Sequence, residues 1–170
     1  MARTWLFGLL ASVLLLMGDF ASAQQGRLDA NGFLRLAASL AAFEIEAGSH
    51  ALQAATRPEV AALARETVEF QGNLMQRLRT VAQQRNLNMP EEMLLEHRAA
   101  LDGLVPLDGE ELNRRYAETQ IQALQQAVEL YRAAAGQDDD PALKGLAAEL
   151  LPGLERQQAM AQELVKAVRP

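Results

Sequence analysis

A chain of 170 residues with a formal net charge of −6 and no cysteine is long enough for one domain with a hydrophobic core. The lack of cysteine excludes a disulfide framework, a thiolate metal site and a cysteine nucleophile. The acidic balance argues against a nucleic-acid-binding protein, whose surface would carry a basic patch. Aromatic residues make up only 5% of the chain while Ala, Leu, Gln and Glu are abundant, so the composition favours helices.

The first 23 residues have the pattern of a secretory signal peptide. Arg3 supplies a positive charge, and residues 5–18 are almost entirely apolar. Ala21 and Ala23 are small where signal peptidase requires small side chains. The apolar run is shorter than the roughly 20 residues that a membrane-spanning helix needs. We therefore predict cleavage after Ala23 and a periplasmic or secreted single domain, residues 24–170, without a membrane span; an uncleaved anchor helix is the alternative.

Along the rest of the chain, apolar residues recur at three- and four-residue steps, the period of a helix. Cap and turn residues, chiefly Asp, Asn, Gly and Pro, divide this pattern into four long segments and one short one. Each long helix would have one apolar stripe and one polar face, as in an antiparallel four-helix bundle. The predicted helices cover residues 33–55, 56–85, 88–103, 108–135 and 141–168.

Local signals set the predicted helix ends. Thr56 and Glu59 have the spacing of a capping box, in which the two side chains satisfy backbone donors reciprocally. Asn86 suits the left-handed position after the second helix. Residues 138–140, all Asp, place negative charge where the last helix begins. Pro152 lies inside that helix and predicts a kink.

The short helix lies in a connection, residues 86–107, that is long for a hairpin loop. The connection could instead run back along the bundle as a ferritin-type crossover. Both topologies remain open from the sequence.

Three polar residues interrupt the apolar stripes: Glu44 in the first helix, Gln71 in the second and Gln157 in the last. A buried polar side chain costs about 1–3 kcal/mol unless it finds a hydrogen-bond partner. We interpret the three as a mid-bundle polar pocket whose members satisfy one another. A pocket for a ligand or a metal ion is the alternative.

Four stretches of the chain resemble the domain of unknown function (DUF) 4142 family, whose members often carry the label "predicted outer membrane protein". They are residues 40–52 (LAAFEIEAGSHAL), 60–90 and 116–131, and Leu150-Leu151-Pro152 with the residues after it. The resemblance covers essentially all of residues 24–170, and it implies a ferritin-like helical bundle exported behind a signal peptide. With the helix pattern, the predicted fold is an all-α, ferritin-like four-helix bundle with a short extra helix between the second and third long helices.

The chain departs from this family at three positions that are commonly histidine. Gln71, Leu124 and Gln157 stand at those positions, whereas Glu44 matches the family's glutamate in the first helix. The resemblance implies that a metal site built on those histidines is lost here, because a neutral amide oxygen is a weak ligand compared with imidazole. Glu44 and Glu69 alone are too few carboxylates for a di-iron site. We expect no metal and no cofactor.

The remaining candidates for catalysis form no recognisable set. His50 and His97 are interpreted as rim or surface histidines, because neither belongs to a group with enough ligands for a metal. Ser39 and Ser49 lie within a helix, without a His and an Asp arranged to activate them. We therefore predict that the protein is not an enzyme.

These features predict a non-catalytic binding or structural module whose ligand and partner the sequence does not specify. Self-association and a peripheral contact with the cell envelope are both open. The alternative is a ferritin-like metal-binding or metal-dependent redox protein. The outer face of the third long helix carries Gln122, Gln125 and Gln126. We expect this face to be solvated, although it could serve a partner.

Overall fold

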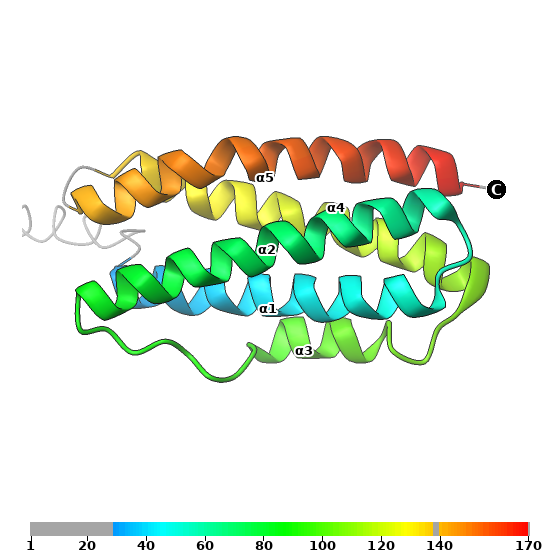
Figure 1. The fold of residues 1–170 in the computed structure, drawn as a ribbon, viewed down its shortest axis with the longest axis horizontal. Coiled ribbons are helices and arrows are strands. Elements are labelled where there is room, and N and C mark those ends of the chain that lie inside the picture. The colour runs from blue at the N-terminus through cyan, green and yellow to red at the C-terminus, as the bar shows by residue number, and fades with distance from the viewer. Residues whose placement is uncertain (1–28, 138–139, 170) are drawn as a thin grey trace, which may run out of the picture.

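The computed structural model describes residues 29–137 and 140–169, and these residues form helices joined by short connections (Figure 1). The predicted signal peptide, its cleavage site after Ala23, and Asp138 and Asp139 lie outside the described residues. In chain order the helices are α1 (Ala30–Ala54), α2 (Pro58–Gln84), α3 (Leu95–Asp102), α4 (Gly109–Ala135) and α5 (Pro141–Val168). The all-α class predicted from the sequence is confirmed.

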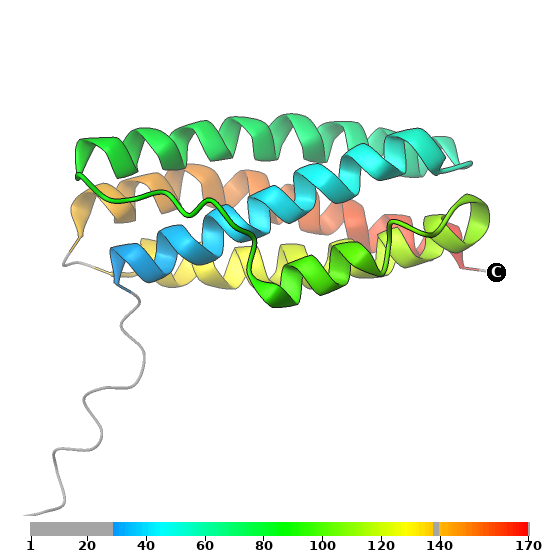
Figure 2. The ribbon, with the colours of Figure 1, turned by 90° about the horizontal axis from the view of Figure 1, so that it is seen from below.

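The four long helices form a bundle in which each helix packs against two antiparallel neighbours. The neighbouring pairs are α1 with α2, α2 with α5, α5 with α4, and α4 with α1. The connection between α2 and α4 runs back along the length of the bundle and carries α3, which packs against the outside of α1 (Figures 1 and 2). Of the two topologies left open by the sequence, the structure therefore has the ferritin-type crossover.

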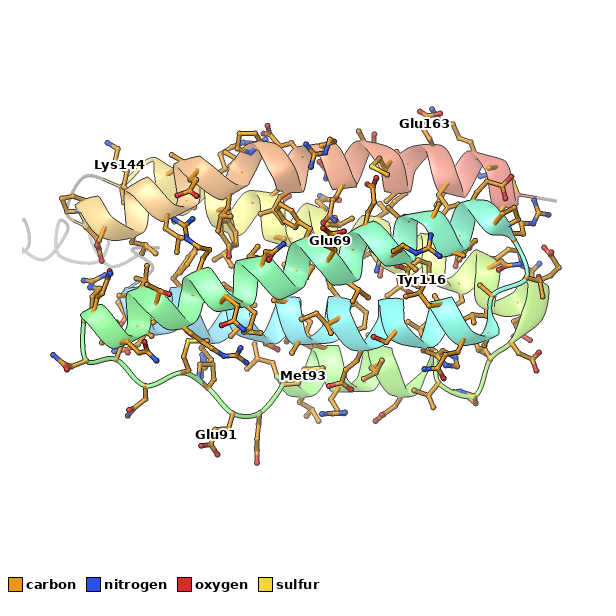
Figure 3. All side chains as sticks on the ribbon, in the orientation of Figure 1. Glu69, Glu91, Met93, Tyr116, Lys144 and Glu163 are labelled. Atoms are coloured by element: carbon orange, nitrogen blue, oxygen red, sulfur yellow. The ribbon has the colours of Figure 1, made fainter. Side chains whose placement is uncertain are left out.

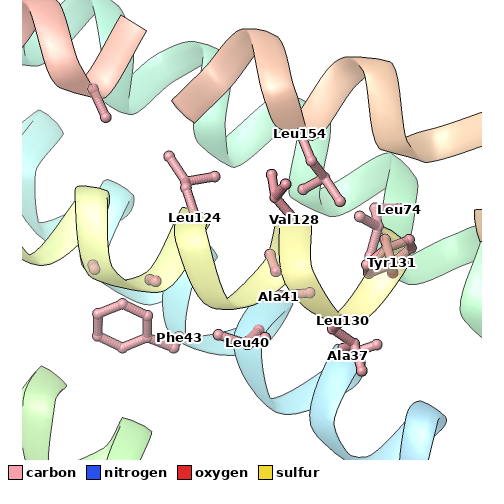
Figure 4. Packing of buried hydrophobic residues seen from close by; sticks show 14 of the residues in the cluster. Ala37, Leu40, Ala41, Phe43, Leu74, Leu124, Val128, Leu130, Tyr131 and Leu154 are labelled. Atoms are coloured by element: carbon pink, nitrogen blue, oxygen red, sulfur yellow. The ribbon is translucent and has the colours of Figure 1, made fainter. Parts of the chain in front are cut away.

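The apolar stripes of the long helices meet in one core. Leu40 of α1, Leu74 of α2, Leu124 of α4 and Leu154 of α5 are all buried and point into the space between the helices (Figure 4). Leu52, four residues after the buried Gly48, is half-exposed and does not continue the apolar stripe of α1. Ala51 continues the stripe instead, and adjacent residues of a helix point about 100° apart.

The predicted capping box before α2 is wrong. Arg57 occupies the N-cap position and Pro58 is the first helical residue, as Pro at this position allows. Thr56 faces α4 instead: its backbone N–H donates to Asn113 Oδ1 at 3.2 Å, and its hydroxyl accepts from Asn113 Nδ2 at 2.8 Å. Asn113 is fully buried, so this loop is tied to the bundle by a tertiary contact rather than by a local cap.

Two other helix ends follow the local prediction. Asn86 has φ +54°, the left-handed conformation expected after α2. Asp140 accepts a hydrogen bond from the Leu143 N–H at 3.0 Å and so caps α5. Asp140 also pairs with Arg85, which joins the end of α2 to the start of α5.

The short helix α3 begins at Leu95, later than the predicted start at residues 88–91. The Leu94 N–H donates to the Ser39 hydroxyl of α1 at 2.7 Å. This tertiary bond, rather than the Asn-Met-Pro-Glu sequence, marks where the connection turns into a helix.

Helix α5 is assigned without interruption across Pro152, so the predicted kink stays a prediction. The residue after it, Gly153, makes room for a neighbour: a Cβ at Gly153 would overlap the ring of Phe70 in α2. The absence of a side chain at this position therefore lets α2 and α5 approach each other at mid-bundle.

Candidate functional site

The three polar residues that interrupt the apolar stripes are all buried. Gln71 and Gln157 contact each other, whereas Glu44 contacts a fourth polar residue, Gln120. Gln71 Nε2 donates to Gln157 Oε1 at 3.4 Å, between α2 and α5. Glu44 Oε2 accepts from Gln120 Nε2 at 2.6 Å, between α1 and α4. The exposed fractions of Glu44, Gln71, Gln120 and Gln157 are 2% or less. Glu44 thus takes its hydrogen bond from a residue that the sequence analysis did not select.

The amide pair lies beside a cleft between α2 and α5. Gln157 Nε2 donates to the backbone oxygen of Glu66 at 3.3 Å, so both ends of the Gln157 amide are used. The cleft has a volume of about 300 Å³, and Glu69 at the middle of α2 lies on it (Figure 3). Besides Gln157, its lining consists of Glu66, Glu69, Phe70, Asn73 and Arg156.

Burial changes the ionisation of Glu44. Loss of water around the carboxyl group raises its pKa from 4.5 to about 8, although the hydrogen bond from Gln120 opposes this rise. Glu44 therefore carries a proton at neutral pH. A neutral carboxyl beside a neutral amide avoids the large cost of an unpaired charge in the core.

The hydroxyl groups of Tyr116 and Thr67 lie near the Glu44–Gln120 pair and are also buried. Burial raises the pKa of Tyr116, and the nearby Glu44 adds to the rise. The side chain of Thr67 is close enough to lower the pKa of Tyr116 slightly, but neither hydroxyl has a partner at normal hydrogen-bond geometry among the described residues. In the same part of the core, a Cβ at Gly48 would come within 2.8 Å of Val68 and 3.7 Å of the Tyr116 oxygen. Close packing of α1 on α2 thus encloses the polar group.

The burial of Gln120 and Thr67 could have been predicted from their positions in the helical repeat. Gln120 lies four residues after Tyr116 and four before Leu124, so it shares their helical face. Thr67 lies on the apolar stripe of α2, four residues before Gln71. A polar residue at such a position is buried whenever its stripe is, whatever its own preference for solvent.

His97 is buried, and its interpretation as a surface or rim histidine is wrong. Its Nδ1 lies 2.6 Å from Ser39 Oγ in α1, and its Nε2 lies 3.2 Å from Gln126 Oε1 in α4. Gln126 Oε1 can only accept, so His97 Nε2 carries a hydrogen and donates to it. In the neutral imidazole Nδ1 then accepts from the Ser39 hydroxyl, whose oxygen also accepts from the Leu94 N–H. Ser39 thus has a histidine partner, but the next residue in the chain of hydrogen bonds is Gln126 and not an Asp.

This chain of hydrogen bonds fixes α3 to the bundle. The exposed fraction of Ser39 is 2%, and its hydroxyl is already used as a donor and as an acceptor. Gln126, predicted on a solvated face, is half-buried because α3 covers it, whereas Gln122 and Gln125 are exposed as predicted.

His50 lies at the rim of the bundle, as predicted. It is partly buried, and its Nε2 lies 3.0 Å from the backbone oxygen of Leu107. This contact holds the end of the crossover against α1.

Within the described ranges, 29–137 and 140–169, no three His, Asp or Glu side chains gather closely enough to share a metal ion. The same residues include no helix with the length and apolar character needed to cross a membrane.

The four packed long helices and their crossover define an all-α helical bundle with buried polar pairs between its helices. The chain belongs to the family described as "Domain of unknown function (DUF4142)", whose model matches residues 17–164. The resemblance found in the sequence is thereby confirmed.

Three solved structures are similar in fold. "CopM in the Cu(II)-bound form" is 19% identical with a TM-score of 0.69, covering 82% of this chain and 97% of that one. "CopM in the Cu(I)-bound form" is 18% identical with a TM-score of 0.71, covering 85% and 100%. A DUF305 fragment from Deinococcus radiodurans is 17% identical with a TM-score of 0.71, covering 81% and 95%. At these identities the likeness shows the fold alone, and no curated protein matches the chain.

Proposed function

We propose that this protein is an exported, non-catalytic binding or structural module whose mid-bundle metal site has degenerated. The observation that carries the proposal is the Gln71–Gln157 hydrogen bond. Two positions that are commonly histidine in the family here hold amides. Gln71 Nε2 donates to Gln157 Oε1, and Gln157 Nε2 donates to the Glu66 backbone oxygen.

The chemistry of the remaining donors supports this loss. Amide oxygens are weak neutral ligands for transition metals compared with imidazole. Leu124, at the third position, offers no donor atom and lies fully buried in the core. Glu44 carries a proton at neutral pH and receives a hydrogen bond from Gln120, so a metal would first have to displace that proton.

We infer that the protein is not catalytic because the buried contact between Ser39 and His97 holds α3 against the bundle. Ser39 and His97 lie beneath the crossover, and only 2% and 6% of their surfaces are exposed. A nucleophile needs access to its substrate, and these two side chains lack it.

A metal-binding or metal-dependent redox bundle is the second candidate, and the two copper-bound CopM structures favour it at the level of fold. Metal analysis separates the two functions. We expect the purified protein to retain no iron, manganese, zinc or copper after dialysis, and stoichiometric metal would overturn the proposal.

Restoring the histidines tests whether the three positions once formed one site. The Gln71→His, Leu124→His, Gln157→His variant is expected to gain affinity for Zn²⁺ or Co²⁺, because imidazole is the commonest ligand for such ions. Calorimetric titration would measure the gain. The matched control, Gln53→His, Gln76→His, Gln122→His, adds three histidines at exposed positions on three different helices. Equal affinity in the two variants would show that the buried positions do not face a common site.

Export gives a separate prediction. Protein recovered from its native compartment should begin at Gln24, because Ala21 and Ala23 fit the signal peptidase pattern. N-terminal sequencing measures this directly. An intact Met1 on the localised protein would support the uncleaved anchor instead.

A further inference from the structure

A groove runs between the first half of α2 and the second half of α5. It has a volume of about 540 Å³ and will be called the α2–α5 groove. Leu63 and Leu164 are its most buried members, and Met160 is half-buried. Its apolar lining consists of Ala62, Leu63, Ala159, Met160, Leu164 and Ala167.

The opposite side of the bundle shows what such a groove can hold. There, α3 packs on α1 and reaches α4 through His97 and Gln126 (Figure 2). The described residues leave the α2–α5 groove uncovered. The bundle therefore has a docked helix along one pair of long helices and an open apolar groove along the other.

The side chains of the groove suit a helix. Ala62, Ala159 and Ala167 are exposed and small, so the backbone of a third helix can approach closely. Met160 is flexible and adapts to the side chains that meet it. The stretch from Arg156 to Ala167 is about 17 Å long at 1.5 Å per residue, which matches about three turns of a partner helix.

The charges around the groove select the partner. Glu59 and Glu163 lie on the α2–α5 groove, and Glu66 and Glu69 lie on the adjoining cleft. Arg156, which lines both, is the one cation among these lining residues. Glu163, which Figure 3 shows on the outside of the bundle near the end of α5, is paired with Lys166 at 2.7 Å. The remaining negative charge along the groove and the cleft is therefore that of Glu59, Glu66 and Glu69, all on α2. Such an edge attracts a basic partner and disfavours a second copy of this chain, whose formal net charge is −6.

We propose that the α2–α5 groove binds a basic amphipathic helix of another protein. The apolar face of that helix lies on the alanines and Met160, and its basic residues face Glu59, Glu66 and Glu69 of α2. This inference rests on the proposed role as a binding module and names the class of its partner.

The test uses two dye-labelled synthetic helical peptides with the same Leu/Ala face. One carries Lys on its polar face and the other carries Glu. Fluorescence anisotropy with the purified protein should show the Lys peptide binding at least about tenfold more tightly than the Glu peptide. Equal binding of the two peptides, or no binding of the Lys peptide, would overturn the proposal.

Variants locate the binding on the groove. Ala159→Trp fills it from an exposed position and should weaken Lys-peptide binding by about tenfold or more. Ala148→Trp, at an exposed position on α5 outside the groove, is the matched control and should leave binding unchanged. Equal binding to both variants would show that the peptide binds elsewhere.

Charge variants and sizing complete the test. The double variant Glu59→Gln, Glu66→Gln should weaken binding several-fold and reduce its dependence on salt, whereas Glu118→Gln, Glu129→Gln on α4 should not. Size-exclusion chromatography at two concentrations should show a monomer. A dimer that disappears in Ala159→Trp would mean that a second copy of this chain occupies the groove, and would contradict the proposal. Metal content tests the lost metal site and peptide binding tests the groove, so either proposal can fail alone.

Discussion

Glu44→Gln should remove a loss of stability that the unaltered protein undergoes between about pH 4.5 and pH 8. Glu44 is fully buried, and its pKa rises from 4.5 in the unfolded chain to about 8 in the folded protein. The folded protein therefore holds this proton more tightly than the unfolded chain does.

The sign follows from that difference. Below pH 4.5 both states are protonated and the stabilising contribution is fully present. As the pH rises towards 8, the unfolded chain releases its proton first, so the free energy of unfolding falls, and above about pH 8 the contribution is lost. The total change attributable to Glu44 is on the order of several kcal/mol.

Chemical denaturation at a series of pH values measures the effect. Gln has nearly the same shape as a protonated Glu and does not ionise, so Glu44→Gln should be flatter in this window and more stable than the unaltered protein at pH 8. Glu46→Gln, two residues along α1 on an exposed side chain, is the matched control and should keep the original slope. A slope retained in Glu44→Gln would show that another group causes it.

Leu154→Ala and Leu74→Ala should each lower the free energy of unfolding by about 2–5 kcal/mol, the range for removing a buried leucine. The exposed fraction of Leu154 is 0% and that of Leu74 is 2%, and both face the core from helices that meet at mid-bundle (Figure 4). Each truncation leaves a cavity that close-packed neighbours fill only in part.

The matched control removes the same atoms from the surface. Leu95 at the start of α3 is 84% exposed, and Leu95→Ala should cost less than about 0.5 kcal/mol. Denaturation midpoints of the three variants check the prediction. If all three midpoints coincide, the core does not depend on the leucines of α2 and α5.

The two polar pairs give this bundle an interior that differs from that of a charged metal centre. Gln71 with Gln157, and Glu44 with Gln120, satisfy part of their hydrogen-bonding capacity without a formal charge at neutral pH. A buried, partly satisfied polar group costs stability, so its presence favours specificity of packing over maximal stability. The pH dependence of the free energy of unfolding that Glu44 causes gives a measure of this cost.

Features that depend on neighbours a few residues apart could be predicted from periodicity and cap residues alone. Helix periodicity predicted four long helices and one short one, and Asn86 and Asp140 marked helix ends because their conformation or hydrogen bond involves residues at most four positions away. The burial of Gln71 and Gln157 also followed, since a residue on an apolar stripe faces the core whatever its polarity.

Which of these residues contact one another became known from the packing of the helices. Glu44 and Gln120 are 76 residues apart in the chain, Ser39 and His97 are 58 apart, and Thr56 and Asn113 are 57 apart. Periodicity places each side chain on a face but carries no information about the partner helix, because that depends on topology and on how far the helices slide along one another. The crossover connection places α3 against α1 and buries His97. It leaves the α2–α5 groove open on the other side of the bundle.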